Sequence, residues 1–141
     1  EALITFKEQL SDPTNSLQTW DQTLASPCSF SHVTCADDVS VTSIDLGLLN
    51  LTGQLVADLG KLTNLQSFSA FENNIYGPIP PEFGEMTELV TLNLFSNNLS
   101  GGIPPELGNL KNLKLIRVIN NPGLSGLVSE ALACHPDKIE L

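Results

Sequence analysis

The chain has 141 residues and a formal net charge of −10, because it contains six lysine and arginine residues and sixteen aspartate and glutamate residues. This length predicts a single domain, and this charge argues against nucleic acid or an anionic membrane surface as a partner while leaving basic partners open. Hydrophobic residues make up 41% of the sequence, which is enough for a core, but no run of about eighteen apolar residues is present to span a bilayer.

An amphipathic helix is predicted at the N-terminus, where four apolar residues share one helical face: Ala2, Leu3, Phe6 and Leu10. The pair Asp12-Pro13 is expected to end this helix, and Leu17 and Trp20 then supply further apolar cover. We therefore expect residues 1–40 to form a cap over the apolar end of the structure that follows.

A pattern of 24 residues repeats through the middle of the chain. The unit that begins at Leu65 reads L-x-x-F-x-A-x-x-N-x-I-x-G-x-I-P, and the unit that begins at Leu89 reads L-x-x-L-x-L-x-x-N-x-L-x-G-x-I-P. The same register extends back to Val41 and forward to Leu132, which gives four units. Apolar residues alternate within each unit, and this alternation predicts a half-buried strand that stacks with its neighbours into one parallel sheet.

Three asparagines occupy the same place in consecutive units, directly after the strand: Asn73, Asn97 and Asn121. A buried amide at this turn can satisfy backbone groups that no strand pairs. A tight bend that disfavours a Cβ is expected at Gly53, Gly77 and Gly101. The Ile-Pro pairs at 79–80 and 103–104 predict an extended outer side with few ladder hydrogen bonds.

The repeat resembles the plant-type leucine-rich repeat over about residues 41–132. This resemblance implies an α/β solenoid with a parallel β-sheet on its concave face and a helical N-terminal cap. Residues 27–35, which read P-C-S-F-S-H-V-T-C after a helix and a tryptophan, resemble the amino-terminal cap of plant leucine-rich-repeat proteins.

The cap resemblance implies a disulfide between Cys28 and Cys35, and a disulfide implies an oxidising compartment, so we expect a secreted or cell-surface protein. Metal binding by the two cysteines is the alternative, although no second pair of cysteine or histidine residues lies at zinc spacing. The sequons that begin at Asn50 and Asn98 agree with secretion and are candidate glycosylation sites.

After the fourth unit, residues 133–141 are expected to form a short C-terminal tail. Val128 and Leu132 continue the repeat before it. If Cys28 and Cys35 pair, Cys134 is a free thiol, an intermolecular link, or half of a bond to a residue outside this chain.

Alternation along the strands predicts which side chains leave the sheet. One column is Asp45, Ser69, Asn93 and Arg117, and the next is Gly47, Phe71, Phe95 and Ile119. The second column predicts an exposed apolar ladder that binds a partner, since aromatic residues are enriched at interface hot spots. The alternative is that β-propensity and cross-strand stacking alone place aromatic residues there.

We take six residues as candidate partner-binding residues: His32, Asp45, Phe71, Phe95, Arg117 and Ile119. Arg117 is a candidate anchor for a carboxylate or a carbonyl, with a solvated arginine as the alternative. His32 is a candidate ligand contact or pH-sensitive group, and the alternative is a cap histidine bonded to the backbone.

The short cap, the motif S-x-x-H-V-T-C, the motif V-T-x-x-D-L-G and the motif L-x-L-F-x-N-N together resemble the somatic-embryogenesis-receptor-kinase ectodomain and its secreted relatives without a kinase. This resemblance implies a co-receptor that docks on a larger receptor kinase and helps to cover its steroid or peptide ligand, or a secreted relative in defence. His32 matches the family's cap histidine, and Phe71 and Arg117 match positions that contact the partner. Ser31 and Ser67 replace aromatic residues of the family.

The sequence therefore predicts an extracellular recognition module, a co-receptor or a soluble decoy, that binds a receptor ectodomain, a peptide or a small ligand. Inhibition of cell-wall-degrading hydrolases is the alternative, because polygalacturonase inhibitors share this repeat and cap, although they use more repeats. No enzyme activity, cofactor or metal is expected, since no catalytic motif is present. Glu82, Glu85 and Glu88 are interpreted as a solvated acidic face.

Overall fold

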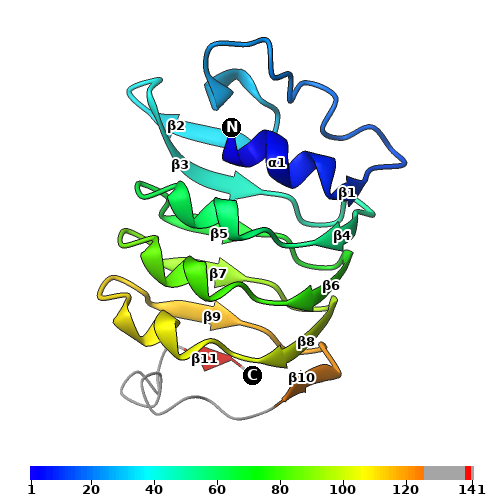
Figure 1. The fold of residues 1–141 in the computed structure, drawn as a ribbon, viewed down its shortest axis with the longest axis vertical. Coiled ribbons are helices and arrows are strands. Elements are labelled where there is room, and N and C mark those ends of the chain that lie inside the picture. Colours follow the sequence, from blue (N-terminus) through cyan, green and yellow to red (C-terminus); the bar gives the residue numbers. More distant parts are fainter. Residues whose placement is uncertain (126–138, 141) are drawn as a thin grey trace.

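In the computed structural model, which describes residues 1–125 and 139–140, the chain winds through successive coils stacked below its N-terminal segment (Figure 1). Each coil contributes one strand to a six-stranded sheet and one to a five-stranded sheet. Four strands of the six-stranded sheet come from consecutive coils: β3 (Ser40–Asp45), β5 (Ser67–Ser69), β7 (Thr91–Asn93) and β9 (Leu115–Arg117). They are parallel and paired in one register, which confirms the parallel strands predicted from the repeat.

Two edge strands of this sheet were not predicted. The hairpin strand β2 (Val33–Ala36) pairs antiparallel with β3, and β11 (Ile139–Glu140) pairs parallel with β9. Ile139 and Glu140, which belong to the expected tail, therefore add a strand to the sheet, with Ile139 opposite Ile116. Val128, Leu132 and Cys134 lie outside the described residues.

The five-stranded sheet corrects the expectation of an outer side with few ladder hydrogen bonds. It consists of β1 (Leu10–Ser11), β4 (Thr52–Gln54), β6 (Asn74–Pro78), β8 (Asn98–Gly102) and β10 (Gly123–Ser125). The expectation was wrong because Pro80 and Pro104 follow the ends of β6 and β8, where the missing N–H interrupts no pairing. Each of these prolines instead precedes a short 3₁₀-helix as its N-cap residue.

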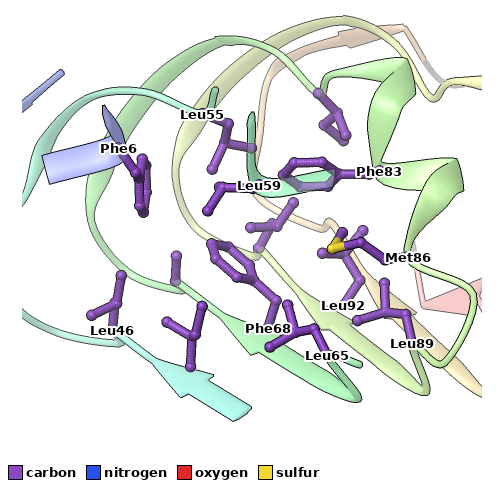
Figure 2. Packing of buried hydrophobic residues seen from close by; sticks show 14 of the residues in the cluster. Phe6, Leu46, Leu55, Leu59, Leu65, Phe68, Phe83, Met86, Leu89 and Leu92 are labelled. Carbon is purple, nitrogen blue, oxygen red and sulfur yellow. The ribbon is translucent and has the colours of Figure 1, made fainter. Parts of the chain in front are cut away.

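Three 3₁₀-helices complete the coils: η2 (Ala57–Lys61), η3 (Pro81–Glu85) and η4 (Pro105–Asn109). Between them and the two sheets lies a continuous core, to which Leu65, Phe68 and Leu92 contribute side chains with no exposed surface (Figure 2). Phe68 lies at the centre of an aromatic chain, with its ring centroid 6.2 Å from that of Phe6 and 6.0 Å from that of Phe83. The core is therefore shared by all coils, and no coil buries its apolar residues alone.

The N-terminal helix α1 (Ala2–Glu8) is shorter than the sequence predicted. Ala2, Leu3 and Phe6 are buried as expected, but Leu10 is not helical, because it belongs to β1 and lies opposite Gly53 of β4. A Cβ on Gly53 would overlap the carbonyl oxygen of Gln9, so the missing side chain allows this close approach. Pairing with a distant strand, rather than the following Asp12-Pro13, ends the helix.

The predicted asparagines form a ladder of buried amides between neighbouring coils. The Nδ2 atom of Asn73 donates to the carbonyl oxygens of Leu46, Ala70 and Phe71 at 2.8–3.1 Å. Its Oδ1 atom accepts from the N–H groups of Leu49 and Leu51 at 3.1 and 3.0 Å. Equivalent bonds join the amides of Asn97 and Asn121 to their own coil and to the preceding one. The structural role predicted for these residues is confirmed.

We expect Asn73→Ala to lower the free energy of unfolding by about 3 kcal/mol, because it leaves buried N–H and C=O groups of two coils without partners. Urea denaturation followed by circular dichroism measures this loss. The matched control is Asn74→Ala, which removes an exposed neighbour and should change stability by less than about 0.5 kcal/mol. Equal losses in the two variants would contradict the structural role of the ladder.

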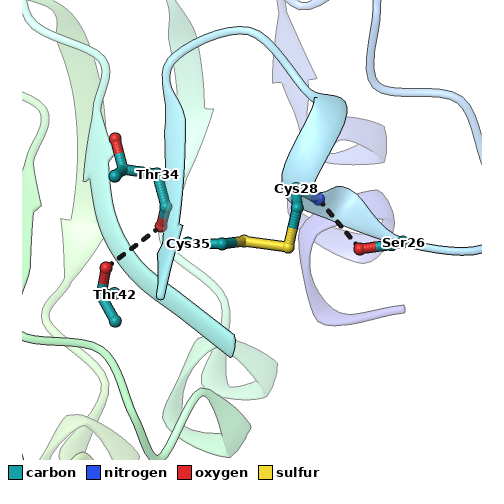
Figure 3. The surroundings of a disulfide bond; sticks show 5 residues. All are labelled: Ser26, Cys28, Thr34, Cys35 and Thr42. Atoms are coloured by element: carbon teal, nitrogen blue, oxygen red, sulfur yellow. Dashed lines mark hydrogen bonds between the residues drawn. A yellow bond between two sulfur atoms is a disulfide. The ribbon is translucent and has the colours of Figure 1, made fainter. Parts of the chain in front are cut away.

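The cap is closed by the disulfide between Cys28 and Cys35 (Figure 3), so the predicted pairing is confirmed and the metal-binding alternative is excluded. Cys28 lies in the 3₁₀-helix η1 (Pro27–Ser29), whose N-cap Ser26 accepts a hydrogen bond from the Cys28 N–H at 3.2 Å. Cys35 lies in β2, so the disulfide joins the cap loop to the edge of the six-stranded sheet. The cap core is Trp20 stacked on Phe30, with ring centroids 5.7 Å apart.

Replacing both cysteines, Cys28→Ala with Cys35→Ala, should lower the free energy of unfolding by about 2.5 kcal/mol, as expected for a closed loop of about eight residues. Thermal denaturation with and without reductant measures the effect. Reductant should lower the melting temperature of the unaltered protein toward that of the variant and leave the variant unchanged. Identical melting temperatures of both proteins under oxidising conditions would show that the disulfide does not stabilise the cap.

Candidate functional site

The candidate binding residues lie on the solvent-facing side of the six-stranded sheet, in two neighbouring columns. The polar column is defined by strand pairing and consists of Asp45, Ser69, Asn93 and Arg117. His32 extends this column into the cap, because its carbonyl oxygen accepts a hydrogen bond from the Asp45 N–H at 2.9 Å. The structure thus aligns three of the predicted residues, His32, Asp45 and Arg117, in one row across the sheet.

The aromatic column lies two residues after the polar column in each coil. It contains Gly47, Phe71 and Phe95. The rings of Phe71 and Phe95 are stacked, with centroids 4.9 Å apart and planes inclined by 10°. Both side chains are half-buried, so the ladder is neither in the core nor fully exposed. The distal half of the Phe71 ring lies over the backbone of Gly47, where a Cβ would overlap it.

The sequence predicted that Ile119 would follow Phe95 in this stack, but Arg117 occupies that place. Its guanidinium carbon lies 4.7 Å from the centroid of the Phe95 ring. Because Phe71 and Arg117 come from the coils on either side of Phe95, they cover opposite faces of its ring. The long arginine side chain reaches across from the polar column, a contact that strand periodicity alone does not predict. Ile119 is half-buried and lines a small cavity of about 190 Å³ with Val118 and Leu124.

The stack therefore presents ring edges, rather than ring faces, to a partner. Phe71 has one face toward Gly47 and the other toward Phe95, and Phe95 lies between Phe71 and Arg117. Aromatic edges carry partial positive charge, whereas the faces carry the negative charge that attracts cations. Contacts to apolar side chains and carbonyl oxygens are thus favoured at the stack.

A third column follows, in which every residue has a left-handed backbone. Leu48, Glu72, Ser96 and Asn120 have φ values of 62°, 52°, 57° and 58°. The N–H groups of Leu48 and Glu72 donate to the carbonyl oxygens of Phe71 and Phe95, so this turn is fixed by the neighbouring coil. Leu48 is the unusual member, because its side chain is 66% exposed and a left-handed conformation costs a leucine roughly 1–2 kcal/mol.

Sequence reasoning did not select Leu48 as a binding residue. The signal that could have identified it is its apolar side chain, since the later coils have glutamate, serine and asparagine at the same place. Its left-handed backbone follows from the repeat geometry and is not visible in the residue type.

The charges around the first two coils on this side are acidic. Asp45 and Glu72 are both exposed and lie on opposite sides of the aromatic column. The basic residue Arg117 belongs to the fourth coil and covers Phe95. Within residues 1–125, the ion pair formed by Lys61 and Asp58 at 3.2 Å lies elsewhere, on η2. The first two coils therefore carry negative charge on this face, beside its apolar residues.

A second hollow, of about 540 Å³, lies in the cap between α1 and residues 18–22. Two of its polar side chains, Lys7 and Asp21, have partners within the protein: Lys7 Nζ donates to the carbonyl oxygen of Trp20 at 2.8 Å. The backbone N–H of Thr23, and then its hydroxyl, donate to Asp21 and lower the pKa of that carboxyl. This internal pairing leaves the cap hollow less suited to polar recognition than the sheet face.

Ser31 is also tied into the cap by hydrogen bonds. Ser31 accepts a hydrogen bond from Trp20 Nε1 at its carbonyl oxygen, and its hydroxyl donates to the carbonyl oxygen of Ser16. Ser67 is half-buried in β5. The sequon residues Asn50 and Asn98 are both exposed.

Over the described residues, no group of three or more histidine, cysteine, aspartate or glutamate side chains is gathered to hold a metal ion. Glu85 and Glu88 are exposed and Glu82 is half-buried. In that same part of the chain, none of the helices has the length and apolar character needed to cross a membrane.

Comparison with known proteins agrees with this geometry. Residues 1–36 match the leucine rich repeat N-terminal domain, and residues 88–110 match the leucine rich repeat. Leucine-rich repeat protein 1 of Oryza sativa subsp. indica is 49% identical over 72 residues, which are 51% of this chain and 34% of that protein. The chain therefore has the leucine-rich-repeat fold and is similar to plant leucine-rich-repeat proteins.

Solved structures of plant receptor ectodomains have the same fold. One is the ectodomain of the Arabidopsis thaliana receptor kinase GASSHO1/SCHENGEN3 in complex with CASPARIAN STRIP INTEGRITY FACTOR 2, with a TM-score of 0.86 and 32% identity over 99% of this chain and 18% of that chain. Another is the Arabidopsis receptor kinase HAESA in complex with the peptide hormone IDA and the co-receptor SERK1, with a TM-score of 0.79 and 34% identity over 95% of this chain and 23% of that chain.

The leucine-rich-repeat protein thus spans about a third of the rice relative and less than a quarter of each of these two receptor chains. Likeness to ligand-binding ectodomains is consistent with the prediction that it is not an enzyme.

We expect Gly47→Ala to move the Phe71 ring away from the first coil, because the new Cβ takes the space that the ring occupies. The ring is the end of a flexible side chain, so the loss of stability should stay below about 1 kcal/mol. Aromatic NMR chemical shifts of Phe71 and Phe95 report the movement. Gly102→Ala is the control, since its Cβ would meet Ser125 Oγ only at 3.6 Å. Unchanged Phe71 shifts in Gly47→Ala would contradict the described contact.

Proposed function

We propose that this leucine-rich-repeat protein is an extracellular, non-enzymatic recognition module in plant signalling or defence. It binds a receptor ectodomain, or a peptide or small ligand of one, through the solvent-facing side of the six-stranded sheet and the adjoining cap, and acts as a co-receptor or a soluble decoy. The observation that carries this proposal is the half-buried stack of Phe71 and Phe95, with the exposed Leu48 beside it. Exposed apolar residues gathered in this way mark a surface that is stabilised when a partner covers it.

The similarity to receptor ectodomains supports the proposed type of partner, because one such structure contains CASPARIAN STRIP INTEGRITY FACTOR 2 and the other contains the peptide hormone IDA and the co-receptor SERK1. The disulfide of the cap supports an oxidising, extracellular location. We further propose that Asn50 and Asn98 carry glycans, for which their exposure leaves room.

The likeness to the somatic-embryogenesis-receptor-kinase ectodomain remains part of this proposal. His32 and Arg117 lie in one row with Asp45, so a partner on this face would meet all three together. Ser31 and Ser67 remove two aromatic contacts of that family, which favours docking on a protein over steroid recognition. In this proposal residues 1–40 act as the cap, 41–132 as four repeats and 133–141 as a tail whose last residues join the sheet.

Binding to purified plant receptor-kinase ectodomains, measured by surface plasmon resonance, tests the proposal. We expect Phe71→Ala with Phe95→Ala to weaken binding about 30-fold, because hot-spot aromatic residues contribute about 2 kcal/mol or more. The control is Tyr76→Ala, which removes an aromatic side chain that is 43% exposed on β6, in the other sheet. Far-UV circular dichroism verifies that each variant is folded.

Equal affinity of the double variant and the unaltered protein would show that the stack serves packing alone. Slower pectin hydrolysis on addition of the protein, without receptor binding, would favour the hydrolase-inhibitor alternative.

A further inference from the structure

We propose that the first two coils select a partner segment that is both apolar and basic, with an apolar side chain against Leu48 and Phe71 and a lysine or arginine beside Asp45 or Glu72. The inference rests on the proposed function and adds the chemistry of the partner. The occupant is an extended peptide.

Leu48 carries the apolar part of this inference. Its side chain is 66% exposed in a left-handed turn where the following coils have polar residues. The Leu48 N–H donates to the Phe71 carbonyl oxygen at 3.1 Å, so the turn lies directly against the second coil. An asparagine would adopt this backbone more readily and would be better solvated. The leucine is therefore unfavourable for the free protein and becomes favourable when another apolar group covers it.

The stacked rings restrict how a cation can bind. Since neighbouring groups cover the faces of Phe71 and Phe95, a partner cation cannot use them for a cation–π contact. The exposed ring edges carry partial positive charge and would repel it. A basic residue must therefore bind at the carboxylates beside the column rather than on the column itself.

Asp45 and Glu72 supply these carboxylates. Both are exposed, and the turn between Phe71 and Glu72 places them on opposite sides of the Phe71 ring. The Oδ1 atom of Asp45 accepts a hydrogen bond from the Gly47 N–H at 3.3 Å, which orients the carboxylate toward the aromatic column. No lysine or arginine stands at a solvent-facing sheet position of the first two coils, residues 42–48 and 66–72. A basic group beside either carboxylate is attracted by it, and the second carboxylate adds to the negative potential of this face.

Fluorescence anisotropy with three labelled synthetic peptides tests the inference. The peptides alternate leucine or valine with lysine, glutamine or glutamate, so that length and apolar content are equal and charge alone differs. We expect the lysine peptide to bind at least about tenfold more tightly than the glutamate peptide and to weaken as salt is raised. Absence of lysine-peptide binding, or equal affinity for all three peptides, would overturn the proposal.

Two sets of variants locate the binding. Leu48→Asn should weaken binding of the lysine and glutamine peptides about tenfold while maintaining or raising the melting temperature. Its control is Val39→Asn, which removes a side chain that is 76% exposed at the hairpin between β2 and β3. Asp45→Asn with Glu72→Gln should weaken the lysine peptide about tenfold and leave the glutamine peptide unchanged. Glu85→Gln with Glu88→Gln removes the same charge elsewhere and should have no effect.

The outcomes separate this inference from the proposed function. If Phe71→Ala with Phe95→Ala abolishes receptor binding but the Leu48 and carboxylate variants bind normally, the proposed function stands and the partner chemistry is wrong. If the phenylalanine variant binds a receptor ectodomain normally, the stack is not part of the binding face, and if the unaltered protein binds no receptor ectodomain, the proposed function itself fails. Loss of peptide binding in the two control variants as well would indicate non-specific adsorption and would also overturn the inference.

Discussion

The buried amide ladder is the interaction on which the rest of the structure depends. Strands β5, β7 and β9 are three residues long, and after each one the chain turns through a left-handed residue and enters the core. That turn carries backbone carbonyl and N–H groups into an apolar interior, where each unpaired group would cost about 1–3 kcal/mol. Asn73, Asn97 and Asn121 satisfy these groups in two coils at once, so they fix both the turn and the distance between coils.

The first coil shows how the ladder tolerates an irregular end. Leu49 stands where the later coils have asparagine, yet the N–H groups of Leu49 and Leu51 both bond to Asn73 of the next coil. The first coil is thus bonded on one side to the amide of Asn73 in the second coil. On the other side it pairs with β1 and β2. The fixed turn is also what holds Leu48 in its unfavourable conformation, because the Leu48 N–H bonds to the second coil.

The features that the sequence predicted are those encoded by local periodicity. The recurrence of Leu65, Phe68 and Ala70 at Leu89, Leu92 and Leu94 was sufficient to place the parallel strands and the solvent-facing columns. The stack of Phe71 on Phe95 followed from the same register. The disulfide required a resemblance, since spacing alone also allowed a metal site.

The features that were missed depend on contacts between distant residues. Leu10 continues the helical pattern of Phe6, and only the pairing with Gly53, which no local pattern reveals, places it in a strand. The five-stranded sheet was missed because the Ile-Pro pairs were expected to leave the outer side with few ladder hydrogen bonds, whereas Pro80 follows the end of β6. Arg117 entered the aromatic stack from another column because its side chain is long, and the column pattern fixes a Cα position without fixing the reach of a side chain.

The aromatic stack serves the protein's packing and its surface at the same time. Stacking and cation–π contacts each contribute about 0.5–1.5 kcal/mol, so Phe71 and Phe95 would favour a strand column even without a partner. Packing does not explain Leu48, because 66% of its side chain remains exposed and its backbone is strained. Nor does packing explain why Asp45 and Glu72 flank the rings, since neither carboxylate has a basic neighbour on the first two coils. The stacked rings form a rigid apolar part of this surface. In our proposal, Leu48, Asp45 and Glu72 around them determine which partner binds.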